Sequence, residues 1–172
     1  MSDLAAFKGV VRRATSDDLG TLGKLAAELV RFHHAIDPER FFLPTGVEEG
    51  YRRWLGTEIQ SAEAIVLVAE LDGAIVGYVY GRLEKRDFNM LLAQHAALHD
   101  VLVVESARRS HAAEALVRRF AELAAEHGAP RVVLHTATSN ERAQALFRKI
   151  GFRPTMLEMT LETKALEPSG DR

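Results

Sequence analysis

The sequence predicts a single mixed α/β domain, and the stretch 98–152 carries the observations that predict it. An apolar, β-branched run beginning at Leu98 (L-H-D-V-L-V-V) predicts a strand, and a second run beginning at Val132 (V-V-L-H-T) predicts another. Each run is followed by a stretch whose apolar residues recur at three- and four-residue spacing, which predicts a helix. Such a strand–helix–strand–helix unit lays its two strands parallel and side by side.

Both helices of this unit have recognisable ends. Gly128 favours a left-handed stop for the first helix, and Pro130 forbids its continuation. The second helix has Ser139 as its candidate N-cap and Gly151 as its terminator. The apolar stripe of the first comprises Ala113, Leu116, Val117, Phe120, Leu123 and Ala124, and that of the second comprises Ala143, Leu146, Phe147 and Ile150. We expect each stripe to pack on the sheet.

The chain before this unit begins with a short strand and two helices. Residues 10–13 alternate weakly and predict the strand. A helix is predicted over 16–34, with its first serine as the N-cap. A proline-containing loop follows, and Thr45 with Glu48 forms a capping-box pattern that opens a second helix over 45–59.

A β-hairpin is predicted next. The apolar, β-branched residues 64–70 read as a buried strand, the Asp-Gly pair at 72–73 as its turn, and residues 74–82 as the returning strand. Gly77 and Gly81 lie in this second strand, where a glycine marks a bulge or a close approach of another group to the backbone.

The whole chain, 1–172, reads as one domain with an ordered core over about 9–162. Residues 85–94 are polar and mixed, which predicts a loop. Residues 155–161 predict a last strand, and 163–172 predict a flexible tail.

Composition excludes several classes of protein. A formal charge of −2 and a pI near 6.4 leave no broad basic surface for nucleic acid. The absence of cysteine excludes disulfides, thiolate nucleophiles and thiolate metal sites. The first residues lack the apolar core of a signal peptide, and no run reaches the length of a membrane span. We therefore expect a cytoplasmic protein that binds neither membrane nor nucleic acid.

The ordered motifs resemble the acetyl-CoA-binding core of the GNAT superfamily of N-acetyltransferases. In that family a strand ending in Val leads into an Arg/Gln-x-x-Gly-x-Gly/Ala turn and a helix. A second strand and an Asn-x-x-Ala-x-x-Leu-Tyr-x-x-x-Gly-Phe helix follow. The matching residues here are Val103, Val104, Arg108, Ala113, Asn140, Ala143, Leu146, Gly151 and Phe152. The resemblance extends from residue 10 to about residue 161 and implies a mixed sheet of six to seven strands, flanked by about four helices. Its parallel central pair is splayed to hold acetyl-CoA.

The resemblance implies transfer of an acetyl group from acetyl-CoA to a primary amine of a small molecule, a peptide or a protein, by direct attack and without a metal. Backbone N–H groups and the helix dipole at the turn would hold the pyrophosphate. A backbone N–H at Val103 or Val104 would polarise the acetyl carbonyl. The implied cofactor-binding residues are Leu102, Val103, Val104, Arg108, Arg109, Ser110, His111, Ala112, Ala113, Asn140, Ala143 and Phe147.

Two residues depart from the family pattern. His111 replaces the first glycine of the turn, where a side chain either crowds the phosphates and opposes a positive φ or points to solvent. Phe147 replaces the tyrosine that protonates the leaving thiolate, so water or the hydroxyl of Tyr78, Tyr80 or Ser139 would have to serve. Asn140 is open to two interpretations, a contact to the pantetheine arm or a helix N-terminal residue.

His99 and Asp100 are the candidate bases. His99 stands where some members of the family carry a glutamate that deprotonates the amine through water, and a histidine titrates near neutral pH. Strand alternation predicts that the two side chains lie on opposite faces of the sheet, so that only one faces the acceptor. The alternatives are a histidine hydrogen-bonded at the edge of a pocket and an aspartate that serves as a structural acceptor.

The sequence says less about the amine that accepts the acetyl group and about partner proteins. By resemblance, the two helices before the hairpin build the acceptor pocket, and a homodimer is implied. The acidic residues Asp37, Glu39, Glu48 and Glu49 could attract a cationic amine. Tyr51 and Trp54 read as core, with a platform for the ligand as the alternative. The adjacent His33 and His34 diverge too far around their helix to share a metal. The rival functions are an acyl-CoA-binding sensor without catalysis and a purely structural interaction module.

Overall fold

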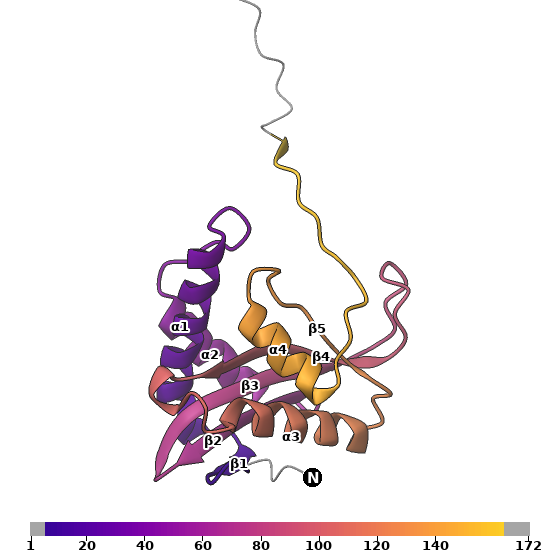
Figure 1. Cartoon of the computed structure of the whole chain (residues 1–172). Helices are drawn as coiled ribbons and strands as arrows, with labels where there is room; N and C mark the ends of the chain where they lie inside the picture. The colour runs from indigo at the N-terminus through magenta and orange to yellow at the C-terminus, as the bar shows by residue number, and fades with distance from the viewer. Residues whose placement is uncertain (1–5, 164–172) are drawn as a thin grey trace, which may run out of the picture.

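The computed structural model describes residues 6–163, which form a five-stranded sheet with helices on both faces (Figure 1). The elements are β1 (Val10–Arg13), α1 (Leu19–Ile36), α2 (Val47–Glu58), β2 (Ala64–Leu71), β3 (Ala74–Glu84), β4 (His95–Val103), α3 (Ala112–Glu126), β5 (Val132–Leu134) and α4 (Glu141–Ile150). Short 3₁₀ turns precede α1 (Ser16–Asp18) and α3 (Glu105–Ala107). The predicted mixed α/β class and the four helices are confirmed.

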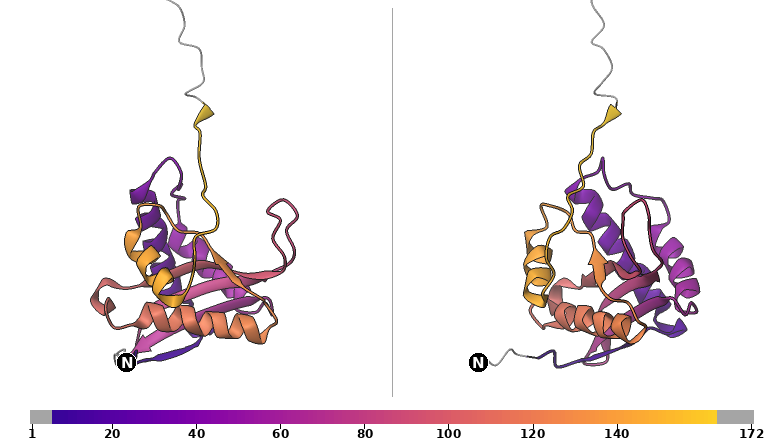
Figure 2. Two further views of the ribbon diagram at one scale, coloured as in Figure 1. Left: turned by 45° about the vertical axis from the view of Figure 1, so that its right-hand side comes forward. Right: turned by 90° about the vertical axis from the view of Figure 1, so that its right-hand side faces the viewer.

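The sheet follows the order of the chain, β1-β2-β3-β4-β5. The first four strands are antiparallel neighbours, and β4 and β5, joined through α3, are parallel. The parallel pair predicted from the sequence is therefore present at one end of the sheet. Helices α1 and α2 cover one face, and α3 and α4 cover the other (Figure 2).

Strand alternation divides the buried side chains into two cores. On the α3/α4 face, Phe120 and Leu116 of α3 are fully buried against the sheet, together with Val79 of β3. On the α1/α2 face, Tyr78 and Tyr80 of β3 are buried among apolar residues of α1 and α2. The two tyrosines thus place polar hydroxyls beneath α2, and this is the face on which the candidate bases lie.

A β-bulge interrupts the β3·β4 pair between Tyr80 and Gly81. The ring of Phe120 lies against Gly81 so closely that a Cβ there would come within 2.6 Å of it. The close approach predicted for this glycine is confirmed, and the extra residue of the bulge lies on β4, at His99.

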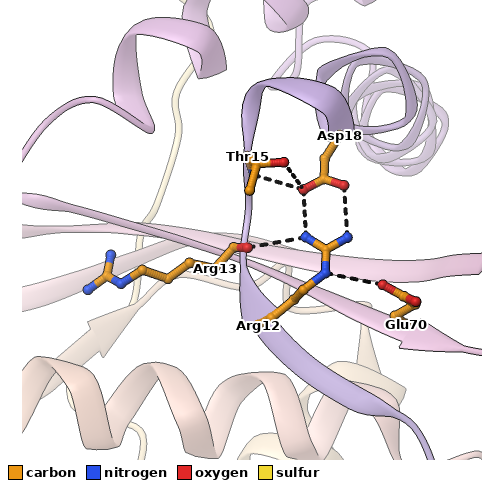
Figure 3. Close-up of polar contacts among 5 residues, drawn as sticks. All are labelled: Arg12, Arg13, Thr15, Asp18 and Glu70. Atoms are coloured by element: carbon orange, nitrogen blue, oxygen red, sulfur yellow. Dashed lines mark hydrogen bonds and ion pairs between the residues drawn. The ribbon is translucent and has the colours of Figure 1, made fainter.

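A partly buried ion pair joins β1 to the start of α1 (Figure 3). Arg12 donates to both carboxylate oxygens of Asp18, at 2.7 and 2.9 Å, and its Nε donates to Glu70 at 3.1 Å. The backbone N–H of Thr15 donates to the same Asp18 carboxylate at 2.8 Å. The cap before α1 is therefore Thr15 with Asp18, and the prediction of Ser16 was wrong.

Two other predicted caps differ from the structure. Gly46, in a left-handed conformation, precedes α2 in place of the capping box of Thr45, and its lack of a Cβ permits that conformation. Asn140 caps α4 in place of Ser139, because its side chain accepts a hydrogen bond from the Ala143 N–H. In both cases helix periodicity predicted the element but did not identify the residue that caps it.

The prediction of six to seven strands was wrong, since the sheet has five. The prediction of a last strand over 155–161 was also wrong, because these residues run extended without forming a strand (Figure 1). The predicted loop 85–94 contains one isolated bridge, between Asp87 and Leu92. Of the predicted tail, 164–172 lies outside the described residues. Over residues 6–163, no helix combines the length and the apolar character that crossing a bilayer requires.

Candidate active site

The parallel pair at one end of the sheet is joined over only part of its length. β4 and β5 pair at Ala96–Val132, Ala97–Val133 and Leu98–Leu134, and the ladder stops there. β4 itself continues to Val103. Its last residues thus keep a β3 neighbour but have no β5 partner, which is the splayed arrangement expected from the sequence.

The backbone of β4 shows which N–H group faces this splay. The N–H of Val104 donates to the Val76 carbonyl oxygen at 2.9 Å and is therefore engaged with β3. In an antiparallel pair, successive residues direct their N–H groups to opposite sides. The Val103 N–H therefore points to the β5 side, beyond the last ladder pair. Of the two amides that the sequence left open, Val103 is the one that faces the splay, while the Leu102 side chain packs on the α1/α2 face.

The turn between β4 and α3 adopts the conformation of a glycine turn without a glycine. Arg109 and His111 both have positive φ values, 72° and 68°. His111 is the residue before α3, and its imidazole Nδ1 lies 3.8 Å from Glu114. The side chain at 111 therefore does not prevent the left-handed conformation. Left-handed residues that alternate along a turn direct its backbone N–H groups into the concave side of that turn. The N–H groups in the first turn of α3 also have no carbonyl partner within their helix.

A hollow of about 570 Å³ lies beside this turn. Its lining is Glu105, Arg108, Arg109 and Arg142. Arg108 is held by an ion pair to Glu105 at 3.0 Å. Three guanidinium groups around a helix N-terminus suit the phosphates of a nucleotide. The residues present therefore fit coenzyme A.

The turn is completed by Ser110, Ala112 and Ala113. Within it, the Ser110 hydroxyl accepts a hydrogen bond from the Ala112 N–H at 3.3 Å. Asn140 is the N-cap of α4, so its Oδ1 is used within the helix. Phe147 is only 6% exposed and packs against Phe152 in the α3/α4 core.

The bulge on β4 brings the two candidate bases to the same face of the sheet. The ring of His99 stacks on that of Tyr80, with 5.5 Å between the ring centroids. Asp100 accepts a hydrogen bond from the Tyr78 hydroxyl at 3.0 Å. Both tyrosines lie on the α1/α2 face, so the prediction that His99 and Asp100 point to opposite faces was wrong. The extra residue in the bulge cancels one step of the alternation.

The surroundings of Asp100 make it an unusual carboxylate. Burial disfavours its charged form and raises its pKa to about 6, although the Tyr78 hydrogen bond acts in the opposite direction. Burial also raises the pKa of Tyr51 to about 12, and the nearby Asp100 charge adds to this. Near neutral pH, Asp100 is therefore ionised but close to its titration range, and Tyr51 keeps its proton.

His99 is held by its neighbours and remains partly open to solvent. Burial lowers its pKa below the ordinary value, so the imidazole is neutral near pH 7. Beneath it, the Tyr80 hydroxyl donates to Glu58 at 2.8 Å. Arg82 also pairs with Glu58, which offsets the charge of that buried carboxylate. His99 thus has the protonation state that a base needs.

A second hollow, of about 290 Å³, lies on α2 and is lined by Gly50, Tyr51 and Trp54. The Trp54 indole is 40% exposed and packs edge-on against Tyr80, with 4.7 Å between the ring centroids. Trp54 is thus not a core residue. An aromatic wall runs from Trp54 through Tyr80 to His99, on the same face as Asp100.

The acidic residues considered for amine attraction are partly engaged elsewhere. Asp37 accepts hydrogen bonds from the backbone N–H groups of Glu39 and Arg40. Glu49 forms an ion pair with Arg52 at 2.8 Å. Glu48, like Glu39, lies exposed on the surface. These contacts reduce the charge that Asp37 and Glu49 offer to an amine.

The histidine pair on α1 fixes the loop that follows it. His33 stacks on Phe41, with 5.1 Å between the ring centroids, and His34 Nδ1 lies 2.7 Å from the Phe41 carbonyl oxygen. Within the described part of the chain, no group of three or more metal-ligating side chains comes together.

Sequence reasoning missed one part of the site and left another open. Arg142, on the first turn of α4, reaches the hollow beside the α3 turn. Its position two residues after Asn140 was the available signal, but the fold alone shows that α4 approaches that turn. Tyr51 packs against the α1/α2 core, as the sequence favoured, and it also lines the hollow on α2 and lies near Asp100.

Comparison with known proteins agrees with this geometry. The model of the Acetyltransferase (GNAT) family matches residues 29–152. The chain is 30% identical over 133 residues to an N-alpha-acetyltransferase of Sulfurisphaera tokodaii, covering 74% of this chain and 77% of the relative.

Solved structures share the fold. A mutant of the BH1408 protein from Bacillus halodurans superposes with a TM-score of 0.77 at 18% identity, over 89% of this chain and 98% of that one. An aminoglycoside N-acetyltransferase in complex with CoA superposes with a TM-score of 0.71 at 15% identity, over 90% and 93% of the two chains. Since the family model spans well over half of the residues, the chain belongs to the GNAT family of acetyltransferases.

Proposed function

We propose that this protein is an N-acetyltransferase that moves an acetyl group from acetyl-CoA to a primary amine by direct attack. One observation carries the proposal. The β4·β5 ladder ends at Leu98–Leu134, and the Val103 N–H faces the space beyond it, next to the turn that fits a pyrophosphate. An acyl-CoA lying along β4 would place its phosphates at the α3 turn and its carbonyl at this amide.

Residues of this chain would perform three tasks. Arg108, Arg109 and Arg142, with the N–H groups of the α3 turn, hold the phosphates. The Val103 N–H donates to the carbonyl oxygen and stabilises the negative charge that develops there. Acetyl-CoA supplies an activated acyl carbon and a thiolate leaving group, so a C–N bond forms as the C–S bond breaks.

The third task is removal of a proton from the attacking amine. Both His99 and Asp100 lie on the acceptor face and are unprotonated near neutral pH, so either is suited to accept it, directly or through a water molecule. The hydroxyls of Tyr78 and Tyr80 donate to carboxylates. We therefore assign protonation of the departing thiolate to water, with the exposed Ser139 as the remaining protein hydroxyl.

The acceptor is a primary amine that reaches the wall of Trp54, Tyr80 and His99. Aromatic faces beside a carboxylate favour a cationic amine before it is deprotonated. The relatives are consistent with this class, since one is named an N-alpha-acetyltransferase and another an aminoglycoside N-acetyltransferase. A peptide N-terminus and an amino sugar both present such an amine.

The proposal is tested in two steps. Saturation with acetyl-CoA, at about one hundred times its Kd, should raise the unfolding temperature by roughly 5 to 10 °C. Incubation with a library of small amines and peptides should then yield a product heavier by one acetyl group, detected by mass spectrometry. Binding without product would instead indicate an acyl-CoA sensor. No thermal shift would remove the coenzyme site and leave a structural module.

A further inference from the structure

The acceptor side of the site is built from aromatic rings. Gly50, Tyr51 and Trp54 line the hollow on α2, and the rings of Tyr51 and Trp54 stand edge to face with centroids 5.4 Å apart. Trp54 packs in turn on Tyr80, which stacks on His99. An unbroken series of ring contacts therefore joins the hollow to a candidate base. The volume of the hollow, about 290 Å³, has room for an apolar group of several carbon atoms.

A glycine inside α2 keeps this hollow open. Glycine destabilises the interior of a helix relative to other residues. The backbone of Gly50 does not require a glycine, because its φ is not positive and an added Cβ would meet no atom within 4 Å. A longer side chain at this position would instead take up space in the hollow that Gly50 lines.

The tyrosines of this face contact two carboxylates, of which one is already paired with a cation. Glu58 accepts from Tyr80 and forms an ion pair with Arg82. Asp100 is buried and accepts from Tyr78, and among the described residues no cation contributes to its environment. One carboxylate is thus free to receive one ammonium group. A second ammonium on the same molecule would enter an aromatic surface without a carboxylate to pair with, which is costly.

We propose that the acceptor is a primary amine whose neighbouring group is apolar and uncharged, either a small alkylamine or the α-amine of a peptide that begins with a bulky apolar residue. This inference rests on the proposed N-acetyltransferase function and narrows its acceptor. The amine loses its proton to His99 or Asp100, and its nitrogen forms the C–N bond as the C–S bond of acetyl-CoA breaks. The apolar group lies in the hollow against Trp54. Polyamines and amino sugars are poor acceptors, because only one of their charges finds a partner.

Three small amines test the preference. Pentylamine adds an apolar chain to ethylamine, and cadaverine adds a second ammonium group at the end of the same chain. The protein has no cysteine, so released CoA is the only thiol in the assay and a thiol reagent measures turnover. The kcat/KM for pentylamine should exceed that for each of the other two about tenfold. Equal or reversed values would overturn the inference.

Peptides carry the same contrast on an α-amine. A peptide that begins with leucine should be acetylated about ten times more efficiently than one that begins with aspartate. Equal efficiencies would contradict the inference for this source of amine. Comparison of the leucine peptide with pentylamine then shows which of the two sources the site prefers.

A pair of glycine variants tests the role of the hollow. Gly50→Leu should reduce the ratio of the kcat/KM values for pentylamine and ethylamine to near one. Gly20→Leu is the matched control, because Gly20 also lies in a helix with no atom within 4 Å of an added Cβ but does not line the hollow. It should keep the ratio of the wild type. Both variants should fold, since leucine favours a helix more than glycine does. A ratio unchanged in Gly50→Leu would place the apolar group elsewhere.

Fluorescence separates this inference from the proposed function. Trp54 is the only tryptophan of the chain and its indole is 40% exposed, so its emission reports on this wall without turnover. With CoA bound, pentylamine should shift the emission to shorter wavelengths, and cadaverine at the same concentration should shift it much less. Equal shifts, or no shift with either amine, would overturn the inference. Unequal shifts without acetylation of any amine would overturn the proposed function alone.

Discussion

Tyr78 donates its phenolic hydrogen to the carboxylate of Asp100, with 3.0 Å between the two oxygens. The hydrogen bond stabilises the ionised carboxylate, while burial destabilises it, and burial is the larger effect. The pKa of Asp100 is therefore about 6, which is within the range of ordinary assays. This pair allows the role of the carboxylate to be measured.

We predict that Tyr78→Phe shifts the acid limb of the pH dependence of kcat/KM to higher pH. Without the donor, the ionised form of Asp100 loses stabilisation and its pKa rises further, by roughly one unit for one charge-assisted hydrogen bond. Tyr80→Phe is the matched control, because its hydroxyl donates to Glu58 and its ring remains beneath His99. A limb that stays in place in Tyr78→Phe would exclude Asp100 from the titration that controls activity.

Asp100→Asn should make the protein more stable near neutral pH and less active. The folded-state pKa of Asp100 lies above its unfolded-state value, so the folded protein binds the extra proton more tightly. Protonated Asp100 therefore adds to the free energy of unfolding. This contribution is present in full below about pH 4 and is lost as the pH rises through about 6. An asparagine keeps an acceptor for Tyr78 without the buried charge. We expect a gain of the order of 2 kcal/mol at neutral pH.

Urea unfolding at neutral pH and at about pH 4 measures this difference. The gain should be present in the first condition and small in the second. A variant that is equally stabilised at both values would show that the effect comes from packing and not from the buried charge.

The sheet and its site differ in how far the sequence predicts them. Periodicity was sufficient for α3, α4 and the parallel β4·β5 pair, because each depends on local spacing of apolar residues. The relation of His99 to Asp100 was not accessible in this way, since a bulge adds one residue to a strand without changing its apolar pattern. Arg142 was missed because its role depends on how close α4 comes to the α3 turn.

The C-terminal segment illustrates a different limit. Alternation of its apolar residues predicted a strand over 155–161, and the structure instead has an extended segment that forms no strand (Figure 1). A strand also needs a neighbour, however, and no local pattern specifies one.

His111→Gly should stabilise the protein and preserve coenzyme binding. A non-glycine residue at a φ of 68° pays roughly 1 kcal/mol or more in backbone strain, while glycine adopts this conformation freely. The greater freedom of glycine in the unfolded chain offsets part of the gain. We therefore expect an increase of up to about 1 kcal/mol in the free energy of unfolding.

His111→Val tests the same argument from the other direction. A β-branched residue tolerates the left-handed conformation poorly, so this variant should be less stable than the wild type. If valine and glycine had the same effect, backbone conformation would not be the cause. Thermal unfolding of the three proteins at one pH is sufficient.

Arg142→Ala should weaken the binding of acetyl-CoA about tenfold, as expected for the loss of one charge-assisted contact to a phosphate in a solvated site. The loss should become smaller at high salt, because exposed charges are screened. Arg148→Ala is the control, since Arg148 lies near the other end of α4 and donates to Gln144. Titration calorimetry at low and high salt measures both variants. Equal affinities in the two would place the phosphates away from the α3 turn.

The ion pair of Arg12 with Asp18 should make the domain sensitive to acid. The guanidinium and the Thr15 N–H hold the pKa of Asp18 at about 2, below its ordinary value. Because this pKa is lowered on folding, the pair stabilises the protein at any pH above the unfolded value near 4, and this contribution is lost as the pH falls towards 2. Asp18→Asn should therefore cost about 2 to 3 kcal/mol at neutral pH.

The neighbouring Asp17 provides the matched control, because it is exposed in the same 3₁₀ turn, whereas Asp18 is only 6% exposed. Asp17→Asn should change stability by no more than about 0.5 kcal/mol. Chemical unfolding at neutral pH and at about pH 3 compares the two variants with the wild type. The deficit of Asp18→Asn should shrink as the medium becomes acidic, since protonation removes the same charge from the wild-type protein. A deficit that stays constant over this interval would mean that β1 is joined to α1 by the shape of the Asp18 side chain, with no contribution from its charge.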